Sequence, residues 1–519
     1  MSEPSRPNRN APASGAAQAT RPAPAKAPAH LWQRAVTLWD DLHLRPLIDY
    51  YFIMIFIVFL AALGVVMVFS SSMTWSVVDT SSVWSTAVRQ AIMVGIGLFL
   101  MWVAMRIRPV TLRVFAPWIL VVAILLLVAV LIPGIGTGKE EVGSQSWISL
   151  GVFSFQPSEI AKVAIAIWGA NYLGQRAEEP GMGKFYVFGG VSGLMVLLIA
   201  LQGDAGMAVT FMLMVAAVAF FAGIHLNYVL GALAFCGAGL VWLAMSGGFR
   251  GNRFTVYFDA LFGHFEDTRG TAFQSYQGFL SLADGAVSGV GLGQSRAKWF
   301  YLPEAKNDFI FAIVGEELGF IGGIFVICAF GGLAFYGLRC ALKSQNTFMS
   351  LLAASLTTGV VVQAFINIGY VVGLFPVTGI QLPMISAGGT SAVITLASMG
   401  LLLSCARYEP EAISAMQSYG KPALDHLLGL REPDASDIDS RRPMPRRAHK
   451  APEPVPVTRQ RPHTAASPRS GEAPGQRVQR PPAQRSVADG GRRPVRGTEA
   501  DPRLRRQQPT QPRRPRKDY

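Results

Sequence analysis

Charged residues are scarce in this 519-residue chain: they make up 15% of the sequence, whereas 51% of it is hydrophobic. Such a composition excludes a soluble multidomain protein, and the length excludes a simple membrane anchor. The sequence predicts an all-α polytopic membrane protein whose apolar runs each have the length of about 20 residues that crosses a bilayer. We expect ten transmembrane helices, at 51–70, 88–107, 115–132, 158–175, 185–202, 205–223, 226–246, 309–338, 349–374 and 385–405.

Cysteine is also rare, and no nucleotide-binding motif is present. The four cysteines lie in or at the end of predicted spans without paired spacing, which excludes a disulfide framework and a zinc site. The glycine-rich "SGVGLGQS" follows no predicted strand and is therefore a weak phosphate signal. The first 30 residues have neither the apolar core nor the cleavage site of a signal peptide, so we expect membrane insertion to use the first span.

The excess of basic residues is confined to one end of the chain. Residues 441–519 hold 21 Lys and Arg against 6 Asp and Glu, whereas the other 440 residues hold 25 against 26. This segment is rich in Pro, Arg and Gln and cannot bury enough apolar surface to fold. We expect disordered cytoplasmic segments at 1–46 and, largely, at 407–519, and no nucleic-acid partner. The basic tail fits anionic lipid headgroups, an acidic partner or a solvated extension equally well.

The short loops predict the orientation, because Lys and Arg concentrate in cytoplasmic loops. With the N-terminus inside, most of the basic short loops fall in the cytoplasm, and the first outer loop has no basic residue. Lys139, in the outer loop after the third span, is a weak exception. The membrane domain then covers 47–406, and a large extracellular loop covers 247–307, between the seventh and eighth spans. Asp308 is thereby predicted at the outer end of the eighth span.

The eighth span carries an unusual pattern of acidic and small residues. Asp308, Ala312, Gly315, Gly319 and Gly323 recur at helical spacing, which predicts a face that another helix can approach closely. A carboxylate at the head of this face would be held at the wall of a packed bundle, where it could act on a substrate. The alternative is that Asp308 is the N-cap of the helix.

Further charges are predicted at membrane depth or at the outer level. Glu159 and Lys162 are three residues apart and can form an ion pair on one helix face, with Asp204 as a third charge nearby. We expect these three residues to form an ion-pair network that supports a cavity wall, and direct contact with a substrate is a compatible alternative. Glu316 and Glu317 are expected to be structural, paired inside the bundle or near backbone donors.

Two outer regions could bind an anion. Arg253 and Lys298, in the predicted loop, suit the diphosphate of a lipid, although an ordinary polar loop would look the same. Ser386, Gly388 and Gly389 would expose hydroxyl and N–H groups at a helix N-terminus, although tight packing also explains these small residues. Gln277 and Glu304 complete the set of candidate substrate-binding residues.

Three segments together resemble the SEDS family of peptidoglycan glycosyltransferases: "FQPSEIAKV", "GLGQSRAKWFYLPEAKNDFIFAIVGEELGFIGG" and "NIGYVVGLFPVTGIQLPMISAGGTS". The stretch "EELGFIGG" is more similar to the division type (FtsW-like) than to the elongation type (RodA-like). The resemblance covers roughly 48–406. It implies ten spans, cytoplasmic termini and an activity that polymerises lipid II at the outer face of the membrane, with Asp308 as the essential aspartate.

The resemblance also implies partners and a mechanism. Asp308 would take a proton from the acceptor sugar, while Arg253, Lys298 or a divalent cation (Mg²⁺ or Mn²⁺, on Asp308) would hold the phosphates. No tightly bound cofactor is expected. The implied partners are a class B penicillin-binding transpeptidase and other division proteins at the septum, with a division-ring protein as a candidate for the tail. A lipid II flippase, an elongation-type polymerase and a scaffold are the alternatives.

Overall fold

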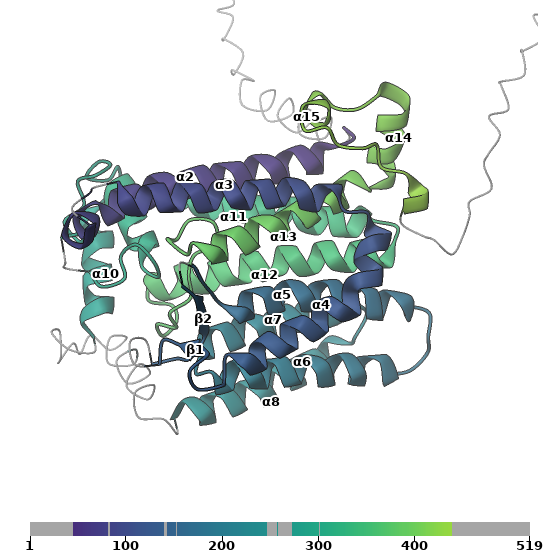
Figure 1. The fold of residues 1–519 in the computed structure, drawn as a ribbon, viewed down its shortest axis with the longest axis horizontal. Helices are drawn as coiled ribbons and strands as arrows, with labels where there is room; N and C mark the ends of the chain where they lie inside the picture. The colour runs from purple at the N-terminus through teal and green to yellow at the C-terminus, as the bar shows by residue number, and fades with distance from the viewer. Residues whose placement is uncertain are drawn as a thin grey trace, which may run out of the picture. The chain divides into compact units, whose positions relative to one another are not determined.

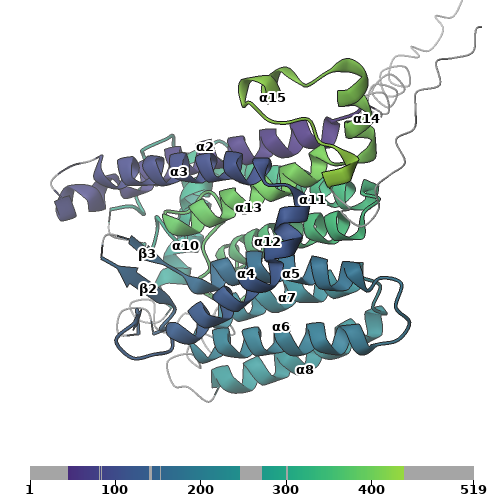
Figure 2. The ribbon, with the colours of Figure 1, turned by 45° about the vertical axis from the view of Figure 1, so that its right-hand side comes forward.

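The computed structural model describes residues 45–80, 82, 84–139, 143–151, 153–245, 257, 272–299 and 302–437. Its helices lie side by side, most of them parallel or antiparallel to one another (Figures 1 and 2). The first half of the described chain contains α2 (Ile48–Thr80), α3 (Ser85–Arg106), α4 (Pro109–Ala129), α5 (Pro157–Gln175), α6 (Gly183–Leu201), α7 (Ala205–Phe221) and α8 (Leu226–Met245). The second half contains α10 (Phe273–Asp284), α11 (Ile310–Lys343), α12 (Thr347–Val371), α13 (Thr390–Arg407), α14 (Pro410–Tyr419), α15 (Ala423–Leu427) and η1 (Ala435–Asp437).

Every predicted apolar run coincides with a helix, with ends that differ by a few residues except in α2, which runs ten residues beyond its predicted end. Seven of the described helices are long and apolar enough to cross a membrane: α2, α3, α4, α6, α11, α12 and α13. The number of ten spans therefore stays a prediction, as does the orientation of the chain. The predicted loop at 247–307 is described only in part, and its described part contains α10.

Local sequence signals begin several of these helices. Pro109 and Pro157 occupy the first turn of α4 and α5, where proline costs no hydrogen bond. Asp204 is the N-cap of α7 and accepts a hydrogen bond of 2.9 Å from the backbone N–H of Met207. Asn346 caps α12 in the same way, because its Oδ1 lies 3.0 Å from the N–H of Phe348.

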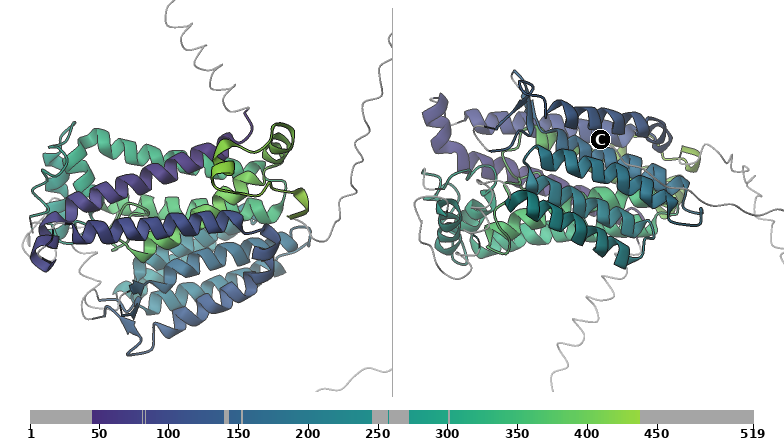
Figure 3. Two further views of the ribbon diagram at one scale, coloured as in Figure 1. Left: turned by 45° about the horizontal axis from the view of Figure 1, so that its top comes forward. Right: turned by 90° about the horizontal axis from the view of Figure 1, so that it is seen from below.

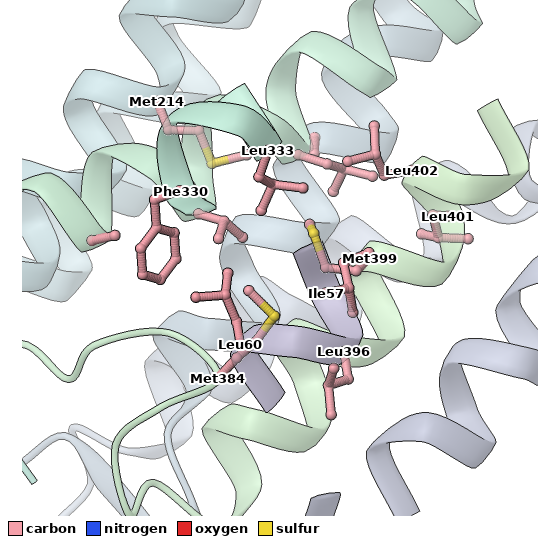
Figure 4. Close-up of a cluster of buried hydrophobic side chains, with 14 of the residues drawn as sticks. Ile57, Leu60, Met214, Phe330, Leu333, Met384, Leu396, Met399, Leu401 and Leu402 are labelled. Atoms are coloured by element: carbon pink, nitrogen blue, oxygen red, sulfur yellow. The ribbon is translucent and has the colours of Figure 1, made fainter. Parts of the chain in front are cut away.

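The centre of the bundle is formed by α12 and α13. In their apolar stretches 72% and 78% of the residues are buried, against 28% in α4. α12 packs against α11, α5 and α7, and α13 packs against α3. Figure 4 shows where α2, α7, α11 and α13 contribute to one buried apolar cluster, which includes Leu60, Met214, Leu333 and Leu396. Because lipid tails are as apolar as these side chains, close packing holds such a cluster together inside a membrane.

The two ends of the bundle differ. At one end α14 and α15 fold back over the start of α2: the hydroxyl of Tyr50 donates to Asp425 (2.8 Å), and the Arg407 guanidinium pairs with the same carboxylate (2.8 Å). The first part of the predicted tail thus contains α14, α15 and η1, and the largely disordered character of 407–519 stays a prediction. The rest of the tail lies outside the described residues. At the other end lies α10, drawn in teal (Figures 1 and 3). The turn that carries Asp308 directly precedes α11.

A small sheet departs from the all-α prediction. β1 (Gly136–Thr137), β2 (Trp147–Leu150) and β3 (Phe153–Phe155) are antiparallel and pair in the order β1-β2-β3. β3 lies against the start of α13, where the hydroxyl of Thr390 donates to the carbonyl of Ser154 (2.8 Å). The sheet thus belongs to the end of the bundle that carries Asp308.

Candidate functional site

A tight turn places Asp308 immediately before α11. Glu304 opens the turn with a positive φ of 54°, and its carbonyl accepts hydrogen bonds from the N–H groups of Asn307 (3.0 Å) and Phe309 (3.2 Å). The helix begins at Ile310 with Phe309 at the N-cap position, so Asp308 lies one residue before the cap. The interpretation of Asp308 as the N-cap is therefore wrong. Its side chain is half-buried.

The backbone around Asp308 is held by the segment that precedes α13. The hydroxyl of Ser386 donates to the carbonyl of Asn307 (2.7 Å), and the N–H of Ala387 donates to the carbonyl of Lys306 (2.9 Å). Ser386 is itself buried, and its carbonyl accepts from the Gln90 amide (3.2 Å). Ser386, predicted to bind substrate, thus fixes the position of the turn.

A cavity of about 490 Å³ adjoins this turn. Its basic side chains are Arg89, which is exposed at the start of α3, and Lys306 from the turn. Its walls come from the start of α3, from β2 and β3, from the turn and from the segment that ends in Thr390. The lining residues are Ser85, Thr86, Arg89, Gln90, Met93, Trp147, Phe153, Ser154, Lys306, Asn307, Gln381, Ala387, Gly388, Gly389 and Thr390. Two cations and several hydroxyl and amide groups suit a phosphorylated sugar.

Gly388 and Gly389 line the cavity directly before α13. This position is compatible with the predicted anion site at the helix N-terminus, which stays a prediction. A Cβ atom at Gly388 would come within 2.1 Å of the Gln381 side-chain oxygen, so a larger residue there would have to displace that side chain. Arg89 was missed by the sequence reasoning, although one signal pointed to it. Arg89 lies at the predicted outer end of the second span, next to a short loop. Because Lys and Arg normally concentrate on the cytoplasmic side, a basic residue at this position suggests a specific role.

The acidic pair of α11 lies at a break in the helix. Gly319 has φ 71° and ψ −169°, values that no helix contains. The segment after α10 fills the break: the N–H groups of Val290 and Gly291 donate to the carbonyls of Glu316 and Glu317, each at 3.0 Å. The predicted continuous helix is therefore wrong at Gly319, and the close approach along this face comes from α10 and the turns that follow it.

Both glutamates are buried and satisfied. Glu316 accepts from the hydroxyl of Ser295 (2.8 Å) and the N–H of Arg296 (2.6 Å). Glu317 accepts from the hydroxyl of Ser70 (2.6 Å) and lies 3.7 Å from the ammonium of Lys298. Their predicted structural role is confirmed.

Lys298 is placed away from the cavity. Its side chain is buried, and its ammonium contacts the carbonyl of Gly293 as well as Glu317. The structure thus gives Lys298 an internal partner, and its phosphate-binding role stays a prediction. Arg253 lies outside the described residues, and Gln277 is a half-buried residue of α10. The exposed carboxylate of Glu304 accepts a hydrogen bond from the Asn307 side chain (2.5 Å).

The predicted charges of α5 form a buried pair. The ammonium of Lys162 lies 3.0 Å from the carboxylate of Glu159, and it also contacts the side-chain oxygen of Gln363 on α12. Asp204 caps α7 and accepts a hydrogen bond from the side-chain amide of Gln156 (2.7 Å). Gln156 lies about one helical turn before Glu159 in the sequence. Whether these residues support substrate binding stays a prediction.

The described residues contain no group of three or more His, Cys, Asp or Glu that could hold a metal ion. A divalent cation on Asp308 would therefore need most of its ligands from water or substrate. Mg²⁺ is commonly bound in this way, by one or two carboxylates together with substrate phosphates.

Comparison with known proteins identifies the family. The sequence model of the FtsW/RodA/SpoVE cell cycle proteins matches residues 51–411. The chain belongs to this family. It is 39% identical, over 75% of its length and 74% of the relative's, to the probable peptidoglycan glycosyltransferase FtsW of Mycobacterium tuberculosis. It is 37% identical to the stage V sporulation protein E of Bacillus subtilis, over 67% of this chain and 94% of the relative.

The fold of this FtsW/RodA/SpoVE family member is similar to that of solved structures. A chain from a peptidoglycan synthase complex that coordinates polymerisation and crosslinking superimposes with a TM-score of 0.56 at 25% identity, over 69% of this chain and 97% of the other. The rod shape determining protein RodA of Thermus thermophilus shares the fold, with a TM-score of 0.51 at 24% identity, over 69% of this chain and 96% of RodA. The family match ends at 411, so most of α14 and all of α15 lie beyond it.

Proposed function

We propose that this protein is a division-type peptidoglycan glycosyltransferase, which polymerises lipid II into glycan strands at the outer face of the cytoplasmic membrane. Relatives at 36–39% identity bear this activity in their names. The observation that carries the proposal is the adjacency of Asp308 to Lys306 and Asn307, which line a cavity that also holds Arg89. A carboxylate base beside a cationic cavity suits sugar transfer from a diphosphate.

In this reaction the Asp308 carboxylate acts as the general base. It takes the proton from a hydroxyl of the acceptor sugar as the oxygen of that hydroxyl attacks the anomeric carbon of the donor sugar. The bond from this carbon to the diphosphate breaks, and the lipid diphosphate leaves with the bonding electron pair. Attack from the side opposite the leaving group inverts the anomeric configuration.

The departing diphosphate gains negative charge, which nearby cations stabilise. Arg89 and Lys306 lie in the cavity wall, and Arg89 can bind a phosphate in a bidentate manner. Arg253 and Lys298 remain candidates for the same task, and a divalent cation bound by Asp308 and the phosphates would add to it. No nucleotide is required, because the lipid diphosphate is already an activated donor.

The wider assembly is part of the same proposal. We place ten spans in the membrane with both termini in the cytoplasm, at the division septum, and a class B penicillin-binding transpeptidase beside the chain. A structural relative belongs to a synthase complex that coordinates polymerisation with crosslinking, which supports such a partner. Asp425 bonds Tyr50 near the start of α2, so the described ends of the chain lie at the same end of the bundle, as an even number of spans requires.

The test uses the purified full-length protein with fluorescent lipid II. We expect glycan strands from the unmodified protein and none from Asp308→Asn, which keeps the size and hydrogen bonding of the side chain but removes its basicity. Circular dichroism and thermal unfolding should be unchanged. Polymerisation by Asp308→Asn at the unmodified rate would exclude the base role. Translocation of lipid II without polymerisation would indicate a flippase, and neither activity would indicate a scaffold.

A further inference from the structure

Three polar side chains form a stripe along the central helix α12. Gln363, Asn367 and Tyr370 are spaced by four and three residues and therefore share one face of the helix. All three are buried, at 1%, 0% and 2% exposure. Buried polar groups inside a membrane protein are costly unless they are paired, and they tend to have specific tasks.

Asn367 directs its amide nitrogen at the backbone of the candidate site. This nitrogen lies 2.9 Å from the carbonyl oxygen of Asp308 and 2.6 Å from that of Ile380. The amide oxygen of Asn367 has no hydrogen-bond partner among the described residues. A carbonyl oxygen can only accept a hydrogen bond, so the two carbonyls require the NH₂ group of the Asn367 amide, and not its oxygen, to face them.

Tyr370 adds a second donor to the same pair of carbonyls. Its hydroxyl lies 2.9 Å from the Asp308 carbonyl and 2.6 Å from the Ile380 carbonyl, and 2.7 Å from the Asn367 nitrogen. Its ring packs against Phe309, with ring centroids 5.7 Å apart. The hydroxyl and the amide together provide the donors that two buried carbonyl oxygens need.

The same stripe also holds the wall of the cavity. Ile380 directly precedes Gln381, which lines the cavity, and the amide of Gln363 donates to the Gln381 carbonyl (3.0 Å). One rigid helix therefore holds both the backbone of Asp308 and the cavity wall. Gln363 and Asn367, one helical turn apart, therefore set the distance between the cavity wall and the backbone of Asp308.

We propose that Asn367 and Tyr370 are positioning residues for the Asp308 carboxylate in glycosyl transfer. This inference rests on the proposed function. Neither residue needs to touch the substrate: they fix the Asp308 carbonyl, and thus the origin of its side chain, at a constant distance from the bound sugar. Because a displacement of about 1 Å in a reacting group can cost about 100-fold in rate, loss of these donors is expected to act on kcat.

The sharpest variant is Tyr370→Phe, which removes one oxygen atom and keeps the ring packing. We expect kcat for lipid II polymerisation to fall about 10- to 100-fold, with KM unchanged within about twofold. Asn367→Leu, which removes the donor at similar volume, is the second variant and should act in the same direction. The matched control is Tyr50→Phe, which removes a buried hydroxyl that bonds Asp425 at the opposite end of the bundle. It should lose as much thermal stability but keep kcat.

A double-mutant cycle separates positioning from mere stability. In an Asp308→Glu background the base is already displaced by one methylene group, so Tyr370→Phe should cost less than in the unmodified protein. An unchanged kcat in Tyr370→Phe and Asn367→Leu, or equal costs in both backgrounds, would overturn the inference. That result together with an inactive Asp308→Asn would leave the proposed function intact, whereas an active Asp308→Asn would refute the base role itself.

Discussion

The ammonium group of Lys298 lies 3.7 Å from a carboxylate oxygen of Glu317, and both side chains are buried. Removal of one partner of a buried ion pair leaves an uncompensated charge and costs about 3 to 5 kcal/mol. We therefore expect Lys298→Met to lower the thermal unfolding temperature of the detergent-solubilised protein markedly. The double variant Lys298→Met, Glu317→Gln should recover most of this loss. An unchanged unfolding temperature with a raised KM would instead assign Lys298 to the substrate phosphates.

Arg89 is exposed in the wall of the cavity, where it can contact a diphosphate. We expect Arg89→Gln to raise KM for lipid II about tenfold, because a charge-assisted phosphate contact is lost, while kcat changes less. High salt should weaken binding to the unmodified protein more than to the variant. Lys139→Gln, an exposed cation outside the cavity lining, is the control. Equal KM values for both variants would remove Arg89 from the substrate site.

Gly319 breaks α11 with a positive φ of 71°. A Cβ atom at this position would lie 2.3 Å from the nitrogen of Gly289, so Gly319→Ala must displace the segment that fills the break. We expect a loss of about 1 to 3 kcal/mol from backbone strain alone, seen as a lower unfolding temperature. Gly331→Ala, in the same helix and with open space around it, should be neutral or stabilising. Equal effects of the two substitutions would contradict a structural role for the break.

Burial raises the pKa of Glu409, between α13 and α14, to about 8, and the neighbouring Asp49 adds to the rise. The pKa in the folded state is thus above the value of 4.5 expected for an unfolded chain. The stability that this carboxyl group contributes is fully present below pH 4.5, and it is lost as the pH rises through about 8. We expect Glu409→Gln to flatten the fall in unfolding temperature over this interval. Glu178→Gln, at an exposed position, should leave the fall unchanged.

The positions of the helices could be predicted from the sequence, because the length of an apolar run and the capping residues act locally. Asp204 is one such capping residue, and Pro157 occupies the first turn of α5. The pairing of Glu159 with Lys162 was also predictable, since residues three apart share a helix face. For the same reason, the location of Asp308 at the head of a helix followed from its place before an apolar run.

Other features depend on contacts between distant segments. The break at Gly319 is stable only because Val290 and Gly291 satisfy the exposed carbonyls, and no helical pattern reveals that they come close. The fold of α14 and α15 depends in the same way on Arg407 and Tyr50, which hold Asp425. A composition poor in apolar residues therefore does not exclude a short helix where such a partner is in reach.

By itself the sequence determined an apolar bundle, the helix that follows Asp308 and the family to which the motifs are similar. Only the tertiary structure decided which polar groups meet: Lys298 with Glu317, Arg89 with the cavity, and Asn367 with the carbonyl of Asp308. The physical reason is that hydropathy and capping act over a few residues, whereas a buried polar group takes whichever partner the packed chain brings within hydrogen-bond distance. Ser70 and Glu317, 247 residues apart, are such a pair.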